Sequence, residues 1–361
     1  MAGITLKKLR GNTVEIIPDL MLADREFVVL TGPGGSGISA IVRMIAGLED
    51  ISEGEILFDN RRIDDLAPRD RDVAFVAHDY APYPGLTVFE NLAMGLRRKN
   101  FADTEIGKRI ASVAAALGIE AQLETNAETL STEQRRFAGL ARAMVRQPKV
   151  YLFDEPFADL EPAAARHGRG EIVKLYRRSP TTIVYATTDP SEALAFGERT
   201  VILIDGAIQQ DSLAQNIYDA PANLAVAKFF GDPPMNLVAG TLKQERNALL
   251  FSEAGDGTMA VPLAADRYSE AKNFIGKPVV FGFHPEDVEI VAESGFRALI
   301  ERVETRGFET NVYLHTGTHA LIARTLRRID QARDGHRIQC GITLEKAHLF
   351  DLETGRRLTR E

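Results

Sequence analysis

Residues 26–39 read EFVVLTGPGGSGIS, and this stretch decides the fold of the chain. Its first part, Glu26 to Leu30, is an apolar run typical of a buried strand. A glycine-rich turn follows directly, and Ser39 to Gly47 then carries enough apolar residues to predict a largely buried helix. A strand, a glycine turn and a helix in this order predict an anion-binding loop, because backbone N–H groups and the positive end of the helix dipole converge there.

The loop fits the phosphate-binding pattern G-x-x-x-x-G-K-[ST] at every position except the lysine. Ile38 replaces that lysine, whereas Ser39 keeps the hydroxyl that can bind Mg²⁺. Taken alone, the match fits a phosphate loop and an ordinary glycine turn about equally well. The residues that we expect to contact a nucleotide here are Gly32, Gly34, Gly35, Ser36, Gly37, Ile38, Ser39 and Ala40.

A second motif favours the nucleotide site. Residues 150–156 read VYLFDEP, an apolar strand that ends in Asp154 and Glu155. In a nucleotide hydrolase the first carboxylate holds Mg²⁺ and the second orients or deprotonates the attacking water. We therefore expect Ser39 and Asp154 to bind Mg²⁺ and Glu155 to be the catalytic carboxylate.

The composition is that of a globular protein, with 45% hydrophobic and 26% charged residues among 361, a length that predicts two domains. The net charge of −8 argues against a nucleic-acid partner, because phosphate binding requires an excess of Lys and Arg. No apolar run is long enough to span a membrane, and residues 1–12 lack an apolar signal core, so we expect a cytoplasmic chain. Cys340 is the only cysteine, which excludes an internal disulfide and a thiolate metal cage.

Short apolar runs alternate with helical segments between residues 73 and 204. Glu133 to Arg146 and Ala163 to Arg177 predict helices. Strands separated by helices predict a largely parallel sheet with helices on its faces. The strands predicted in this region are Val73–Val76, Val150–Phe153, Thr182–Tyr185 and Val201–Ile204.

The pattern changes after the turn-rich stretch Gly231 to Pro234. Short strands with charged turns follow, which predicts a small β-barrel or sandwich. We place the boundary at about residue 233, giving domains 1–233 and 234–361. His315 and His319 would form a metal pair only on a helix, and they lie in a strand–turn–strand pattern, so we assign no metal beyond Mg²⁺ with nucleotide.

With these motifs in place, the chain resembles the nucleotide-binding subunits of ABC transporters, and more narrowly those of sugar and glycerol-phosphate importers. Leu130 to Arg136 lie where the family has its LSGGQ signature, and Asp159 to Glu161 occupy its D-loop. The resemblance implies a P-loop α/β domain with a helical subdomain at about 85–147, then an all-β OB-like (TOBE) regulatory domain. It rests further on residues 83–92, which resemble the permease-facing segment, and on 221–223, 231–236, 283–286 and 348–351.

The chain departs from this family at positions that contact phosphate. Ile38 lacks the charge that bridges the β- and γ-phosphates. His78 lies where the family's glutamine gives an oxygen to Mg²⁺, and it is either a solvated loop histidine or a pH switch. Thr188 lies where a family histidine contacts the γ-phosphate, and a threonine is shorter and uncharged.

The signature segment also departs from the family. Ser131 and Gln134 keep capping-box spacing and are the residues expected to approach the nucleotide of the opposite subunit. Glu133 falls in the first turn, where a carboxylate stabilises the helix but competes with phosphate for its positive end. The alternative is that Glu133 turns to solvent and has little effect.

The resemblance implies an ATP- and Mg²⁺-binding subunit at the cytoplasmic face of the bacterial inner membrane. Its partners would be two membrane permease subunits and a periplasmic solute-binding protein for a carbohydrate or polyol such as glycerol. The altered phosphate contacts predict the degenerate half of a heterodimeric ATPase, paired with a second ATPase subunit whose motifs are intact. Asp154 and Glu155 would then persist for residual nucleotide binding or because they are harmless. Two alternatives remain, a homodimeric ATPase with reduced turnover and a regulatory protein without a transport role.

Overall fold

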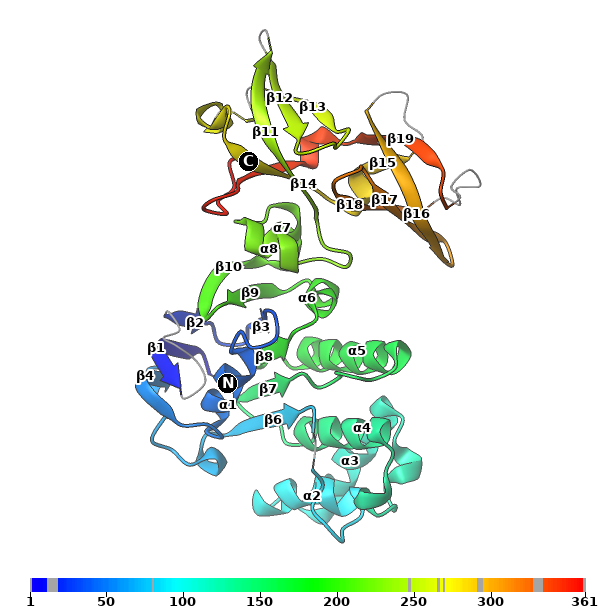
Figure 1. Cartoon of the computed structure of the whole chain (residues 1–361). Helices are drawn as coiled ribbons and strands as arrows, with labels where there is room; N and C mark the ends of the chain where they lie inside the picture. The colour runs from blue at the N-terminus through cyan, green and yellow to red at the C-terminus, as the bar shows by residue number, and fades with distance from the viewer. Residues whose placement is uncertain are drawn as a thin grey trace. The chain divides into compact units, whose positions relative to one another are not determined.

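The computed structural model describes residues 2–11, 19–79, 81–245, 248–264, 267–268, 270–290, 295–326 and 334–359 (Figure 1). The chain forms two compact units, Met1–Ala214 and Gln215–Glu361. The sequence places the boundary at about residue 233, so α7 (Ala214–Asp219) and α8 (Leu224–Phe229), which it assigns to the first domain, lie almost wholly in the second unit. Within the described residues, no helix is both long and apolar enough to cross a membrane.

The first unit is built around a six-stranded sheet whose order is β10-β9-β3-β8-β7-β6. Five strands are parallel and β10 is antiparallel to β9, which confirms the predicted parallel sheet. All residues of β3, β7 and β8 are buried, as is typical of parallel strands covered on both faces. The bounds are β3 (Phe27–Thr31), β6 (Val73–Ala77), β7 (Val150–Asp154), β8 (Thr182–Thr187), β9 (Arg199–Ile204) and β10 (Ala207–Leu213).

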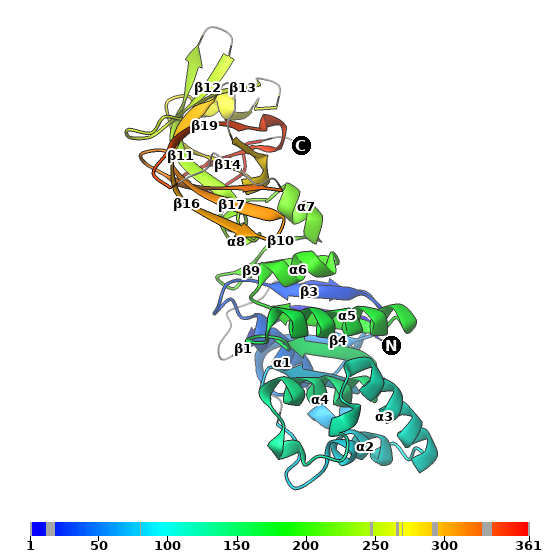
Figure 2. The same ribbon diagram turned by 90° about the vertical axis from the view of Figure 1, so that its right-hand side faces the viewer.

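Alternating side chains divide the two faces of this sheet. Val28, Leu152 and Val184 share one hydrophobic cluster with α1 (Ile38–Ala46). On the other face Phe27 packs edge-on against Tyr176 of α5 (Pro162–Arg178), and Tyr185 packs against Phe196 of α6 (Pro190–Phe196). Both views place α1 on one side of the sheet and α5 and α6 on the other (Figures 1 and 2).

A second, four-stranded antiparallel sheet lies on the α1 side, in the order β2-β1-β4-β5. This sheet was not predicted from the sequence, because its strands are short or carry charged residues at exposed positions. Ile4, Leu6 and Ile56 from this sheet are fully buried in the cluster that contains α1. The bounds are β1 (Ile4–Gly11), β2 (Leu20–Leu22), β4 (Ile51–Phe58) and β5 (Arg61–Arg62), followed by the 3₁₀ helix η1 (Pro68–Asp70).

Three helices follow one another between β6 and β7 and lie next to β6 (Figure 1). They are α2 (Val88–Arg98), α3 (Asp103–Leu117) and α4 (Thr132–Met144), with η2 (Glu120–Gln122) and η3 (Ala127–Thr129) before α4. Both α2 and α4 begin with complete capping boxes, Thr87 with Glu90 and Ser131 with Gln134. The predicted start of the signature helix is therefore confirmed.

Apart from α7 and α8, the second unit is built from two five-stranded antiparallel sheets, which confirms the all-β architecture predicted for residues 234–361. The sheet orders are β13-β12-β11-β14-β20 and β15-β19-β16-β17-β18. Phe251 and Phe281 from the first sheet and Ile300 and Val312 from the second are fully buried in one core.

Ten strands and three 3₁₀ helices make up the described part of this unit after α8. They are β11 (Asn236–Glu245), β12 (Ala248–Glu253), β13 (Ala260–Leu263), η4 (Glu270–Phe274), β14 (Pro278–Phe283), η5 (Pro285–Asp287), β15 (Val288–Ile290), β16 (Phe296–Arg306), β17 (Glu309–His315), β18 (Ala320–Thr325), β19 (Arg337–Ile342), η6 (Leu344–Lys346) and β20 (His348–Asp351).

The two histidines considered as a metal pair have other roles in this unit. His319 Nδ1 donates to Glu253 Oε1 at 2.7 Å, and its Nε2 accepts from the Ala239 N–H at 3.1 Å. His315 Nδ1 accepts from the Gly317 N–H at 3.0 Å. The His315 ring is thus held by a local hydrogen bond, whereas the His319 ring joins the β17–β18 turn to β11 and β12.

Candidate nucleotide-binding site

The glycine loop between β3 and α1 has the tight course that its sequence predicts. A Cβ on Gly32 would lie 2.0 Å from the backbone oxygen of Leu203, so no other residue fits there without a shift of β9. Gly35 and Gly37 have φ angles of +85° and +93°, which favour glycine. A Cβ on Gly34 or Gly35 would meet nothing within 4 Å, so this side of the loop is open to a ligand.

The first turn of α1 is suited to an anion. Its N-cap residue, Gly37, has no side chain that could accept hydrogen bonds from the first-turn N–H groups. By contrast, the Thr87 hydroxyl accepts from Glu90 N at the start of α2. The N–H groups at the start of α1 therefore need another acceptor, and a phosphate provides several at the positive end of the helix dipole.

The loop lines a cavity of about 280 Å³ together with residues from α1 and from the ends of β7 and β8. The cavity brings together all the predicted loop contacts except Gly32, as well as Glu155 and Thr188. Its lining residues are Pro33, Gly34, Gly35, Ser36, Gly37, Ile38, Ser39, Ala40, Arg43, Glu155 and Thr188.

Ile38 gives this site no cationic group. Its side chain is 2% exposed and belongs to the hydrophobic cluster around α1. The basic residue that lines the cavity is instead Arg43, which our sequence analysis missed. Its spacing was the available signal, because positions i and i+4 share a helix face and Arg43 follows Ser39 by four residues.

Arg43 is tied to two carboxylates. Its Nη1 lies 3.2 Å from Asp154 Oδ2, and its Nε lies 3.4 Å from Glu49 Oε2. The Arg43 side chain is 41% exposed, whereas that of Asp154 is 5% exposed. Arg43 therefore balances a carboxylate that would otherwise be buried as an unpaired charge.

The donor atoms near the loop fit Mg²⁺. Asp154 Oδ1 is buried and has no hydrogen-bond partner among the described residues, and the same holds for Ser36 Oγ. Mg²⁺ prefers carboxylate and hydroxyl oxygens together with water and phosphate. Asp154 and Ser39 would hold the ion, which supplies positive charge to the phosphates when it is bound.

Glu155 has the surroundings of a general base. It directly follows β7, with φ of +46°, and its N–H donates to Ala186 O at 2.9 Å. Burial raises the pKa of its carboxyl and the neighbouring Asp154 raises it further, while a hydrogen bond from Thr188 and the His78 ring oppose the rise. A raised pKa makes the carboxylate a stronger base, so it accepts a proton from the attacking water more readily.

Three of the other predicted contacts lie outside this cavity. His78, just after β6, is exposed and is not among the lining residues, although it opposes the rise in the pKa of Glu155. Ser131 and Gln134 use their side chains in the capping box of α4. Glu133 is exposed and, with Gln134, lines a separate cavity of about 470 Å³ that also includes residues of α3 and α5.

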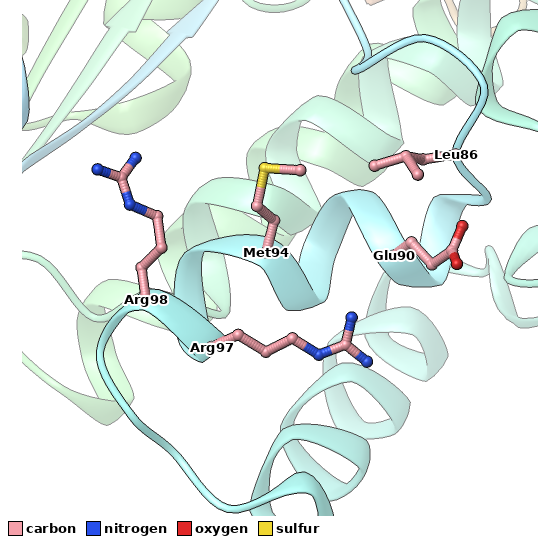
Figure 3. A pocket seen from close by; sticks show the side chains of 5 residues that line it. All are labelled: Leu86, Glu90, Met94, Arg97 and Arg98. Carbon is pink, nitrogen blue, oxygen red and sulfur yellow. The ribbon is translucent and has the colours of Figure 1, made fainter.

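A groove on α2 is a second site-like feature of the first unit (Figure 3). It has a volume of about 470 Å³ and is lined by Leu86, Glu90, Met94, Arg97 and Arg98. Figure 3 shows Met94 on the same side of the helix as Leu86, while Arg97 extends along the helix toward Glu90. Asn91, 1% exposed, fixes the preceding segment, because its side chain accepts from Tyr83 N at 2.7 Å and donates to Thr87 O at 2.9 Å.

Comparison with known families agrees with this geometry. Residues 18–158, which contain the loop, α2–α4 and β7, match the family model described as ABC transporter. Residues 231–288 match the model described as MalK OB fold domain.

Curated relatives extend the similarity over nearly the whole chain. The oligosaccharides import ATP-binding protein MsmX of Bacillus subtilis is 38% identical over 343 residues, covering 93% of this chain and 92% of the relative. The sn-glycerol-3-phosphate import ATP-binding protein UgpC of Bordetella avium is 36% identical over 366 residues, covering 98% and 97%.

A solved structure shows the same architecture for the first unit. The dimeric structure of MJ0796, a bacterial ABC transporter cassette, aligns with a TM-score of 0.54 at 26% identity, covering 58% of this chain and 98% of that one. A post-hydrolysis structure of the same cassette, bound to ADP and Pi, aligns with a TM-score of 0.53. ATP with Mg²⁺ is the ligand of this family, in keeping with the geometry of the loop cavity. The chain therefore belongs to the ABC transporter ATPases, in the same family as the MsmX and UgpC import proteins.

Proposed function

We propose that this chain is the ATP-binding subunit of an importer for a carbohydrate or polyol and the degenerate half of a heterodimeric ATPase. The observation that carries the second part is the buried Ile38 at the loop position where the phosphate-binding pattern has lysine. A lysine there neutralises charge on the transferring phosphoryl group, so its loss lowers turnover more than it lowers nucleotide binding.

The remaining features support a chain that binds nucleotide and hydrolyses it slowly. The glycine loop, the open first turn of α1 and the buried Asp154 are all retained. Thr188 directly follows β8 and hydrogen-bonds Glu155, but it carries no charge toward a phosphate. Hydrolysis in the complex would then occur at an intact second subunit, with the Ser131 end of α4 facing that nucleotide.

The groove on α2 supports a role beside a permease. Leu86 and Met94 provide apolar surface, while Glu90, Arg97 and Arg98 provide charge at its rim. This composition suits a short amphipathic helix from a membrane subunit. Two such permeases, together with a periplasmic solute-binding protein, would place the chain at the cytoplasmic face of the inner membrane. The names of the relatives support oligosaccharides or glycerol phosphate as the solute class, and glycerol is a further candidate.

The test is a matched pair of substitutions in the membrane complex, purified through a tag on this chain. Glu155→Gln should lower transport less than twofold, because this site contributes little turnover, whereas the same change at the corresponding glutamate of the second ATPase should abolish it. A tenfold or larger loss from Glu155→Gln would overturn the degenerate assignment.

The composition of the purified complex decides between the alternatives. Recovery of two permeases and a second ATPase with an intact lysine loop supports the proposal. Recovery of permeases with only copies of this chain, and ATPase activity of the chain alone, would establish a homodimer with reduced turnover. Recovery without any permease would establish the regulatory alternative.

A further inference from the structure

We propose that Arg43 takes over the phosphate-binding role of the missing loop lysine in this chain. The inference rests on the proposed function in one respect, since it assumes that this chain's own loop binds a nucleotide. It goes further because it names the residue that supplies the positive charge.

The cavity requires a cation that its loop does not provide. A bound triphosphate brings several negative charges to the start of α1, and backbone N–H groups offset them only partly. Among the described residues that line the cavity, Arg43 is the one with a basic side chain. Ile38, the first residue of the helix, is uncharged and is buried in the hydrophobic cluster.

The position of Arg43 on α1 allows this role. It lies four residues after Ser39, so the two side chains share one face of the helix. Although Arg43 lies in the last turn of α1 and its Nε contacts Glu49 beyond the helix, its Nη1 reaches Asp154 at the end of β7 and the residue lines the loop cavity. The Arg43 side chain is 41% exposed, and the residue lines the cavity.

The contacts of Arg43 leave part of its guanidinium group available. Nη1 contacts Asp154 and Nε contacts Glu49, at 3.2 Å and 3.4 Å. A guanidinium group carries five N–H donors, and the hydrogen bonds seen among the described residues use one on Nη1 and one on Nε, which leaves further donors for a phosphate oxygen. The buried Asp154 also fixes the position of the group, so that a fixed fork, rather than a freely moving side chain, meets the ligand.

The experiment is a double-mutant cycle with the full chain, in which ATP binding is measured by titration calorimetry with and without Mg²⁺. We expect Arg43→Gln to weaken ATP binding about tenfold, the loss of one charge-assisted contact. In an Ile38→Lys background, where the lysine is restored, the same change should weaken binding by less than about threefold. Arg69→Gln, which alters an exposed arginine that does not line the cavity, is the matched control and should change nothing.

Each outcome decides the inference. Equal losses in the two backgrounds would show that Arg43 acts only by stabilising α1 and Asp154, and no loss in the natural background would show that it does not contact phosphate. If Ile38→Lys fails to fold, Arg43→Lys decides. Lysine keeps the positive charge but not the planar fork, so with an unchanged melting temperature an affinity between those of the natural chain and Arg43→Gln supports the inference, and an affinity as weak as that of Arg43→Gln overturns it. A natural chain that binds no ATP would overturn this inference together with the ATP-binding part of the proposed function, whereas ATP binding that Arg43→Gln leaves unchanged would overturn this inference alone.

Discussion

At the scale of single residues, Gly32 shows how little freedom the loop allows. The backbone oxygen of Leu203 lies where a side chain at this position would begin, at 2.0 Å from a Cβ. Gly34, two residues later, has open space around the same point. Gly32 is therefore required by the packing of the loop against β9, whereas Gly34 leaves space for a ligand.

We predict that Gly32→Ala lowers the free energy of unfolding by about 1–3 kcal/mol or more, because β9 must shift to admit the methyl group. Gly34→Ala, the matched control, should change it by less than about 0.5 kcal/mol. Urea unfolding followed by circular dichroism measures both. Equal midpoints for the two variants would show that the loop accommodates a side chain at either position.

At the scale of elements, α4 carries a carboxylate that stabilises the helix but would weaken the binding of a phosphate at the helix N-terminus. Glu133 lies in the first turn, after the Ser131–Gln134 capping box, and is exposed. A negative charge there stabilises the helix by about 0.3–1 kcal/mol. A phosphate from a facing subunit would compete with it for the same positive end.

We predict that Glu133→Gln lowers the unfolding free energy by a few tenths of a kcal/mol and raises ATP turnover of the assembled importer about two- to fivefold. Thermal melting and a phosphate-release assay give the two values. Glu124→Gln, an exposed residue outside the helices, should leave both unchanged. A stability loss without a gain in turnover would mean that the carboxylate faces solvent and does not oppose the phosphate.

At the scale of the whole molecule, the pH dependence of unfolding reflects a buried histidine. His348 is 4% exposed, and its Nε2–H donates to Asp219 O at 2.8 Å. Its pKa is lowered to about 4, mainly by burial, with smaller contributions from Arg357, Arg267 and His284, while the Asp219 contact opposes the shift. Because the folded pKa is below the unfolded value of about 6.5, the unfolded chain binds more protons as the pH falls.

We predict that this histidine contributes stability at pH 7 that is lost progressively as the pH falls from about 6.5 toward 4. The loss between pH 7 and pH 5 should be on the order of 2 kcal/mol. In His348→Gln, which keeps an N–H donor but does not titrate, the loss over that interval should be smaller by this amount. His336→Gln, at an exposed histidine, should follow the natural chain. Urea unfolding at the two pH values tests it, and identical acid sensitivity in all three chains would contradict the prediction.

The sequence by itself determined the parallel sheet, the glycine loop and the all-β second part. Local chemistry carries each of these signals. Apolar runs of strand length predicted β3, β7 and β8, and Ser131 with Gln134 predicted the start of α4. The sequence also shows that the loop lysine is absent, because Ile38 occupies its position in an otherwise complete pattern.

Only the tertiary structure decided where charge and space lie in the site. It buried Ile38 in the cluster around α1, placed Arg43 beside Asp154 and left His78 outside the cavity. It also brought the charged strands β1 and β4 into one antiparallel sheet. These outcomes depend on pairs of residues that are distant in the chain, and their contacts form only when the strands and α1 pack, so no local pattern in the sequence contains them.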